Sequence, residues 1–160
     1  MSSPTHPAKA TPLPGAALPV AALLGAAKEA FAAEFDARIK ASNMSALSLA
    51  HAHNVLRHLG NGPLRASAIT DRCGVTKQAV SQQIAHLQRS GFVRALPDPD
   101  DQRARLIELT ECGRAAQVMV KQLFADIERD WTKRIGKEQM AILREALATI
   151  GADHMPDSCS

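Results

Sequence analysis

The sequence predicts a mainly α-helical fold that carries one β-hairpin, and three observations support this class. Apolar residues recur at steps of three and four over the segments 20–40, 45–59, 66–90 and 110–150, as in α-helices. Short β-prone runs occur between residues 92 and 109. The chain of 160 residues has four Phe, one Trp and no Tyr, so its core consists mainly of aliphatic side chains that let helices pack closely.

A polar break separates the first two predicted helices. The first helix is expected from Val20 to Lys40. The second is expected from about Ser45 to Leu59, where the segment Gly60–Pro63 stops it. This second helix is apolar on two sides, which predicts a position between two layers. Its two faces carry Leu49, Ala52, Leu56 and Leu59 on one side, and Leu47, His51, Val55 and His58 on the other.

A short helix, a glycine turn and another helix come next. The short helix is expected at about Ala66–Cys73, and it is followed by a turn at Gly74. Thr76 is expected to cap the next helix, which reaches Ser90. The buried face of that helix is predicted to consist of Val80, Ile84 and Leu87.

The remaining elements are a hairpin and two helices. The runs 92–96 and 105–109 predict two strands, because the segment between them is rich in turn-forming Pro and Asp. Thr110 is expected to cap a long helix that ends at about Ile135, and a last helix follows from Lys137 to Ile150. The chain therefore has six predicted helices and one hairpin.

This order of elements predicts a winged helix-turn-helix, in which the second helix of the pair enters the DNA major groove. The exposed face of that helix carries Lys77, Gln78, Ser81, Gln82 and Arg89, which are side chains that bond base edges or phosphates. Arg103 lies just beyond the hairpin loop, and Arg105 follows along the strand. A cationic tip of this kind suits the minor groove, where negative potential is concentrated.

Other function classes are disfavoured by the composition. The formal net charge of +3 is compatible with a nucleic-acid partner. No glycine-rich phosphate loop, H-E-x-x-H sequence or nucleophile elbow is present, so we expect no enzyme, no catalytic residue and no cofactor. Three widely spaced cysteines argue against a disulfide framework or a zinc finger. Pro19 interrupts the apolar stretch near the N-terminus, which favours a cytoplasmic protein without a membrane partner over a secreted one.

The segment from Leu64 to Gly113 resembles the DNA-binding part of the MarR family of bacterial regulators. The resemblance runs through Ile69–Thr76, Val80-Ser81, Leu87–Val93 and Asp98–Arg103. Its most specific part is D-x-R followed by L-T-x-x-G, here Asp101 and Arg103, then Leu109, Thr110 and Gly113. The order of helices extends the resemblance over about 20–150. This chain departs from the family pattern at Leu49, His53 and Gln102.

The resemblance implies a homodimer that binds a pseudo-palindromic double-stranded operator. The composition predicts a disordered Pro/Ala-rich tail (1–18) and a flexible tail (151–160), which leaves one domain (19–150). Within the domain, 19–41 and 110–150 would form the dimer, and 45–109 would bind DNA. Thr76, Gln78, Ser81 and Gln82 would face the major groove. Arg103 would enter the minor groove, and Asp101 would orient the wing arginines.

The family also implies a small effector, often a phenolic acid, that releases a repressor from DNA. Its pocket would be lined by His51, His58, Phe35 and Val55, because a histidine can hold a carboxylate. Three alternatives stay open. Cys112, in the first turn of the long helix, could sense oxidants, whereas Cys73 is expected to be buried and inert. A metal sensor would draw on His51, His53, His58 and Glu34, although their spacing suits no single ion, so no metal site is expected. The winged helix could also serve only protein–protein assembly.

Overall fold

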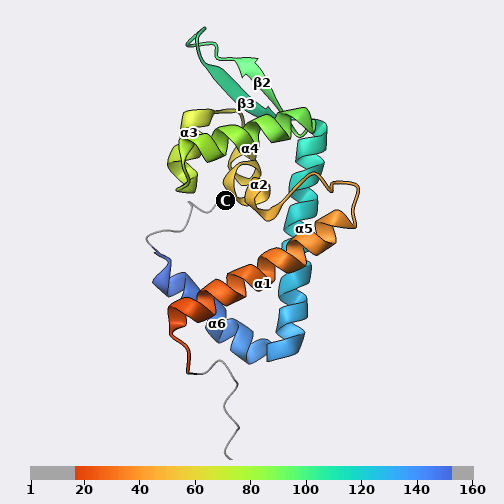
Figure 1. The fold of residues 1–160 in the computed structure, drawn as a ribbon, viewed down its shortest axis with the longest axis vertical. Helices are drawn as coiled ribbons and strands as arrows, with labels where there is room; N and C mark the ends of the chain where they lie inside the picture. The colour runs from red at the N-terminus through yellow and green to blue at the C-terminus, as the bar shows by residue number, and fades with distance from the viewer. Residues whose placement is uncertain (1–16, 153–160) are drawn as a thin grey trace, which may run out of the picture.

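The fold is that of a computed structural model, in which residues 17–152 are described. Most of the two predicted tails, residues 1–16 and 153–160, lies outside this range. Figure 1 shows the wing at one end of the molecule, next to α3 and α4, with α1 and α6 towards the other end. The elements in chain order are α1 (Val20–Lys40), α2 (Leu49–Asn54), the 3-10 helix η1 (Leu56–Leu59), β1 (Leu64–Arg65), α3 (Ala66–Cys73), α4 (Lys77–Arg89), β2 (Val93–Pro97), β3 (Arg105–Leu109), α5 (Glu111–Ile135) and α6 (Lys137–Ile150).

Most of the predicted elements are found within one or two residues of their expected ends. The α3 helix has the predicted bounds, and α4, β2, β3, α5 and α6 differ from theirs by no more than a residue or two. The predicted fold class, a mainly α-helical winged helix-turn-helix with six helices, is therefore confirmed.

The second predicted helix is the main error, because it is divided and starts later than expected. Ser48 caps α2 in a capping box: its hydroxyl accepts from the His51 N–H, and the His51 ring accepts from the Ser48 N–H. These bonds fix the start of α2 after Leu47, which lies in the preceding turn. The α2 helix then ends at Val55, and η1 continues the chain. Leu47 and Val55 are buried all the same, which is why their spacing looked helical.

The sheet has a strand that the sequence pattern did not reveal. Its order is β1–β3–β2, with antiparallel pairing throughout. Leu64 in β1 lies opposite Ile107 in β3. Only two residues of β1 are paired, so the strand is too short to show an alternating pattern.

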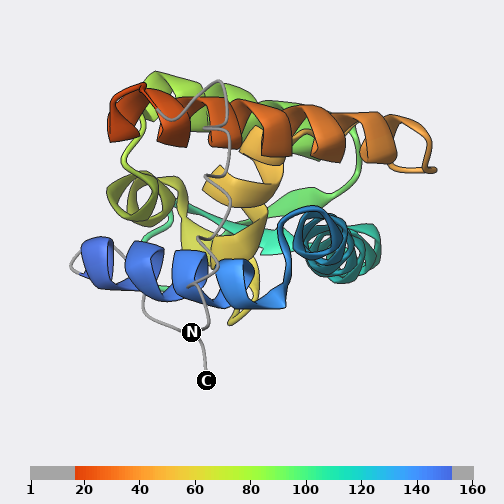
Figure 2. The same cartoon turned by 90° about the horizontal axis from the view of Figure 1, so that it is seen from below.

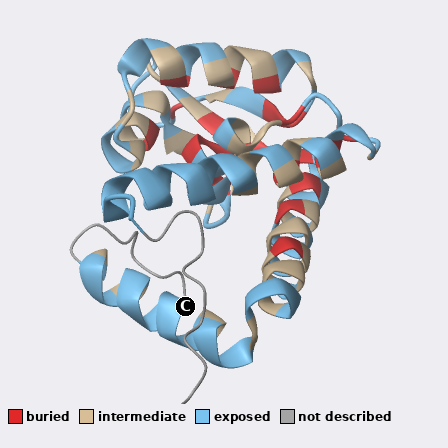
Figure 3. Ribbon diagram, turned by 60° about the horizontal axis from the view of Figure 1, so that its bottom comes forward, coloured by how far each residue is buried: buried red, intermediate tan, exposed pale blue. Residues whose placement is uncertain are grey.

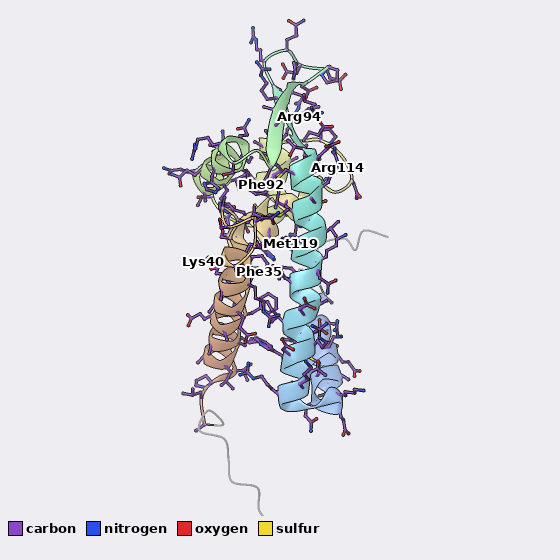
Figure 4. The ribbon with its side chains drawn as sticks, turned by 90° about the vertical axis from the view of Figure 1, so that its right-hand side faces the viewer. Phe35, Lys40, Phe92, Arg94, Arg114 and Met119 are labelled. Atoms are coloured by element: carbon purple, nitrogen blue, oxygen red, sulfur yellow. The ribbon has the colours of Figure 1, made fainter. Side chains whose placement is uncertain are left out.

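Aromatic rings join α1 to α5. Phe31 packs against Phe124 and Trp131 with ring centroids 5.3 and 5.8 Å apart, and Phe35 lies 5.6 Å from Phe124. The Trp131 indole N–H donates to Glu34 at 2.9 Å. Figure 4 shows Phe35 between the two helices. The few aromatic residues of the chain are thus concentrated where the first helix meets the long one.

The α6 helix and the start of α1 leave apolar side chains uncovered. Figure 2 looks nearly along α5 and shows α6 turning back from its end. No residue of α6 is buried, and Figure 3 shows most of this helix exposed. Large exposed apolar side chains on these elements, or just before α1, are Leu18, Val20, Leu23, Leu24, Ile142, Leu143, Leu147 and Ile150. Within residues 17–152, no helix is both long enough and apolar enough to span a membrane.

Candidate nucleic-acid interface

A glycine shapes the turn between α3 and α4. Helix α3 ends at Gly74, whose φ of 65° lies in the left-handed region that glycine adopts without a side-chain clash. Thr76 then caps α4, because its side-chain oxygen accepts from the Ala79 N–H at 3.2 Å. The face of α4 that packs into the core consists of Val80, Ile84 and Leu87. The opposite face therefore points to solvent.

The solvent face of α4 is polar and contains no acidic residue. Every predicted groove-facing residue on this helix or at its cap is exposed, namely Thr76, Lys77, Gln78, Ser81, Gln82 and Arg89. Glutamine can donate to and accept from an adenine edge, and lysine or arginine can donate to guanine or phosphate. This face can therefore lie against a polyanion and read base edges.

Two histidines, His86 of α4 and His51 of α2, connect α4 to α2. The His86 ring nitrogen Nε2 donates to the Ala46 carbonyl at 2.7 Å. The ring also stacks on His51 of α2, with centroids 4.5 Å apart and planes 3° apart. Burial lowers the pKa of His51, nearby His86 lowers it further, and Asp36 acts in the opposite direction. The surroundings therefore favour the neutral His51 ring, and the stack docks α4 on α2.

The wing consists of β2, β3 and the loop 98–104. Arg103 in the loop and Arg105 at the start of β3 are both exposed. The Asp101 carboxylate accepts from the main-chain N–H of Arg103 at 3.0 Å, and the Asp101 carbonyl accepts from the Ala104 N–H at 2.9 Å. Asp101 thus shapes the loop backbone. Its predicted role of orienting the wing arginines stays a prediction.

A second aspartate, which the sequence reasoning did not single out as a site residue, anchors the loop. Asp98 is only 5 % exposed. Its carboxylate accepts from the Arg65 Nε–H at 2.5 Å and from the Asp100 N–H at 2.9 Å. The Arg65 guanidinium holds the pKa of Asp98 below its usual range. The pairing joins residues 33 positions apart, so no local spacing in the sequence could reveal it.

Thr110 and Gly113 connect the wing to α5. The Thr110 hydroxyl donates to the Gly91 carbonyl at 2.6 Å and accepts from the Gly113 N–H at 3.1 Å. A side chain at position 113 would bring a Cβ within 2.0 Å of the Phe92 carbonyl oxygen. Figure 4 shows Phe92 beside the first turns of α5. The L-T-x-x-G spacing therefore reflects a close approach of two backbone segments.

Four cations of α4 and the wing are free to meet a partner, whereas Arg94 of β2 pairs with Glu108 of β3 at 2.7 Å. Within residues 17–152, the structure shows no ion pair for Lys77, Arg89, Arg103 or Arg105. Elsewhere, several arginines are paired inside the chain. Arg38 lies 2.9 Å from Asp130, Arg134 lies 3.2 Å from Glu34, and Arg144 pairs with Glu128. Uncompensated positive charge is therefore present on the groove-facing elements.

The residues of the predicted effector pocket lie around α2, but two of them have no free surface. Phe35 and Val55 are completely buried in the core. His51 is engaged in the capping box and the ring stack, and the His58 ring accepts from the Arg57 Nε–H at 3.2 Å. Burial, with Arg57, Arg72 and His53 nearby, lowers the pKa of His58 from 6.5 to about 4. The pocket stays a prediction.

The two described cysteines differ in exposure. Cys112 is exposed in the first turn of α5, as predicted. Cys73 was expected to be buried, but it is half-buried, and its Sγ lies 3.6 Å from the Thr70 carbonyl. It lies on the last turn of a helix that ends at the surface, so solvent reaches one side of it. Cys159 lies outside the described residues, and within 17–152 no three metal-binding side chains gather.

Comparisons with known proteins agree with this architecture. A sequence model of the MarR family matches residues 47–104. Over 100 residues, the chain is 38 % identical to the HTH-type transcriptional regulator TcaR of Staphylococcus aureus strain Newman. That alignment covers 61 % of this chain and 66 % of TcaR, just under two thirds of the relative.

Solved structures show the same fold. The reduced form of MarR from E. coli superposes with a TM-score of 0.75 at 19 % identity, covering 83 % of this chain and 96 % of MarR. The transcriptional repressor CouR, bound to a 23-mer DNA duplex, superposes with a TM-score of 0.73 at 22 % identity, covering 89 % of this chain and 99 % of CouR. From the family match, the TcaR identity and the shared winged helix, the chain belongs to the MarR family.

Proposed function

We propose that the protein is a sequence-specific DNA-binding transcription regulator, not an enzyme, and that it acts in the cytoplasm as a homodimeric repressor. The observation that carries this proposal is the exposed polar face of α4 together with the unpaired cations of α4 and the wing. Figure 1 shows both elements at the same end of the molecule. The repressor CouR, which has the same fold, was solved with a DNA duplex.

Each group at this end has a role that suits one part of the duplex. Thr76, Gln78, Ser81 and Gln82 would face base edges in the major groove, where donor and acceptor patterns distinguish all four base pairs. Lys77 and Arg89 would meet phosphates, which position a protein without reading sequence. Arg103 would enter the minor groove, and Arg105 would contact the backbone beside it.

The exposed apolar residues of α1 and α6 suit a dimer, in which a second copy of the chain would cover them. Ile142 and Ile150 are 61 % and 74 % exposed, and burying such side chains in a dimer would be favourable. A two-fold dimer presents two α4 helices, so it would recognise a pseudo-palindromic operator with half-sites roughly 34 Å apart.

We infer that a small anionic effector regulates DNA binding, because positively charged side chains lie near α2. His53, Arg57, His58 and Arg72 lie near one another around α2, η1 and α3, and within 17–152 neither arginine has a carboxylate within ion-pair distance. The two arginines are exposed, and positive groups attract a carboxylate. Binding there would shift α2, on which α4 docks through the His51–His86 stack, and so move α4 and weaken the DNA complex. In this proposal, His51 and His58 line the pocket once the Phe35 and Val55 layer opens.

The test is binding of the purified full chain to the DNA upstream of its own gene, measured by fluorescence anisotropy at two salt concentrations beside a scrambled duplex. We expect tighter binding to the native duplex and a steep loss of affinity with salt. In Arg103→Ala, affinity should fall about tenfold for both duplexes and the salt dependence should become shallower, while the dimer persists. In Gln82→Ala, the preference for the native duplex should shrink.

Two outcomes would count against the proposal. Equal, weak binding to native and scrambled duplexes, and to a pool of genomic fragments, would favour a protein-interaction role for the winged helix. Loss of the dimer in Arg103→Ala would contradict the assignment of Arg103 to the wing tip. With a specific duplex established, salicylate, Zn²⁺ and hydrogen peroxide can be added in turn. Release by Zn²⁺ or peroxide alone would favour a metal- or Cys112-based sensor over an anionic effector.

A further inference from the structure

The wing loop is attached to the rest of the DNA-binding part through one buried carboxylate. Asp98 follows β2 directly, and it is 5 % exposed although its neighbours in the loop are exposed. Its main-chain N–H donates to the Ala104 carbonyl at 3.3 Å, which closes the loop. Its carboxylate accepts from Arg65 and from the Asp100 N–H. Both ends of the loop therefore depend on this residue.

Arg65 reaches this carboxylate from the far side of the sheet. It lies opposite Leu106 of β3, and Leu106 lies opposite Leu96 of β2 on its other side. Two strand spacings, about 10 Å in all, separate β1 from β2. Arg65 is also the N-cap residue directly before α3. The ion pair thus spans the sheet and links the start of the helix-turn-helix to the wing loop.

The same guanidinium offsets the negative charge of the loop. The pKa of Arg65 is raised by the hydrogen bond and charge of Asp98, and further by Asp101 and Asp100. These three carboxylates lie within a few residues of Arg103, the proposed minor-groove contact. Uncompensated carboxylates at that place would repel DNA phosphates.

We propose that Arg65 and Asp98 are positioning residues for DNA binding: their ion pair holds the wing loop so that Arg103 faces the minor groove. This inference rests on the proposed function. Neither Arg65 nor Asp98 needs to touch DNA. Through the loop, the two residues would still control how tightly Arg103 binds DNA.

The aspartates give the proposal a test in which two explanations predict opposite signs. If charge alone matters, Asp98→Asn removes a negative group near phosphate and strengthens binding. If position matters, the same change frees the loop and weakens binding. Asp100→Asn is the matched control, because it removes the same charge two residues away, and within 17–152 its carboxylate accepts no hydrogen bond in the structure.

We expect Asp98→Asn to bind the specific duplex about tenfold more weakly, in the range set by loss of a charged hydrogen bond. Asp100→Asn should bind equally or more tightly. Arg65→Gln should weaken binding by a similar factor, and the double variant Arg65→Gln with Asp98→Asn should be little weaker than either single variant. Tighter binding by Asp98→Asn, or additive losses in the double variant, would overturn the proposal.

Amide hydrogen exchange of the free protein separates this proposal from the question of DNA binding. In Asp98→Asn and Arg65→Gln, exchange of the Arg103 and Ala104 amides should be about tenfold faster, because the loop opens more often. The α5 amides should keep their protection, which shows that the fold is intact. Unchanged exchange in the loop would overturn the proposal even if the wild-type protein binds DNA specifically. Faster exchange without any specific DNA binding would leave the wing anchor established and contradict its role in binding.

Discussion

Gly113 occupies a place where two backbone segments meet. A Cβ there would lie 2.0 Å from the Phe92 carbonyl oxygen and 3.0 Å from the Leu109 side chain. Neither neighbour is the flexible end of a long side chain, so α5 and the wing would have to move apart. The family motif ending in this glycine therefore has a steric cause that applies to any side chain.

Replacing Gly113 by Ala should lower the free energy of unfolding by about 3 kcal/mol, the upper part of the range for overpacked positions. Urea denaturation measures the change. Gly25 of α1 is the matched control, because a Cβ there meets nothing within 4 Å. In a helix interior, Gly25→Ala should raise stability by about 0.5–1 kcal/mol. An equal effect at both glycines would contradict the steric explanation.

His58 makes stability depend on pH. Its pKa is about 4 in the folded protein and 6.5 in the unfolded chain, because burial, Arg57, Arg72 and His53 disfavour the imidazolium. Between these values the unfolded chain binds more protons, so the free energy of unfolding falls as pH falls from about 6.5 towards 4. Since the ring is partly exposed, we expect a loss of about 1 kcal/mol between about pH 7 and pH 5.

The variant His58→Gln should lose less stability over the same pH range, measured by urea denaturation at both pH values. His51 has a lowered pKa too, so the residual pH dependence should have the same sign. A pH dependence as steep in His58→Gln as in the wild type would show that His58 is not its source.

The sequence predicted the position of some site residues and not the contacts of others. The exposed residues of α4 were predicted because their helix has a clear apolar side, which fixes the opposite face. Asp101 was expected to orient the wing arginines, and in the structure its carboxylate accepts from the main-chain N–H of Arg103. The role of Arg65 could not be predicted, because Arg65 meets Asp98 only after three strands have paired. Contacts made across a sheet are not encoded in local spacing.

At the scale of elements, the long helices and α3 were predicted well, and α2 was predicted poorly. The α5 helix has 25 residues, so its apolar period is repeated many times. The α2 helix has six, and its neighbours Leu47 and Val55 are buried from turns. Tertiary contacts bury these residues at a spacing that is also typical of one continuous helix, so the sequence pattern predicted a single helix. The capping box of Ser48 and His51 decided the true start through local hydrogen bonds.

If that capping box sets the start of α2, Ser48→Ala should lower the free energy of unfolding by about 1 kcal/mol. Ser45→Ala is the control, because Ser45 is exposed in the preceding turn and makes no side-chain hydrogen bond among those the structure shows within 17–152. Thermal unfolding by circular dichroism compares the two. Equal melting temperatures for Ser48→Ala and Ser45→Ala would contradict the capping role.

At the scale of the whole molecule, the two ends have different surfaces. The end with α4 and the wing carries unpaired cations, and the end with α6 and the start of α1 carries uncovered apolar residues. Figure 3 shows α6 largely exposed, in contrast to the buried core. The sequence predicted both surfaces from helical periodicity, but their separation along the molecule depends on the straight run of α5 between them.

Leu147→Glu should convert the dimer to a monomer, because it places a charge on the exposed apolar face of α6. Sedimentation velocity measures the change, and DNA affinity should fall with it. Val118 is 70 % exposed but lies on the half of α5 nearer the wing, so Val118→Glu should stay dimeric. A dimeric Leu147→Glu would place the interface elsewhere.

If two copies of α4 read a specific duplex, selection from a random DNA library will recover that duplex. The purified full chain is used to enrich duplexes over several rounds, and the survivors are sequenced. Two α4 helices related by a two-fold axis should select an inverted repeat whose half-sites lie about one helical turn apart, with altered preferences within each half-site for Gln82→Ala. Survivors without a common sequence, or a single site without a repeat, would contradict this prediction.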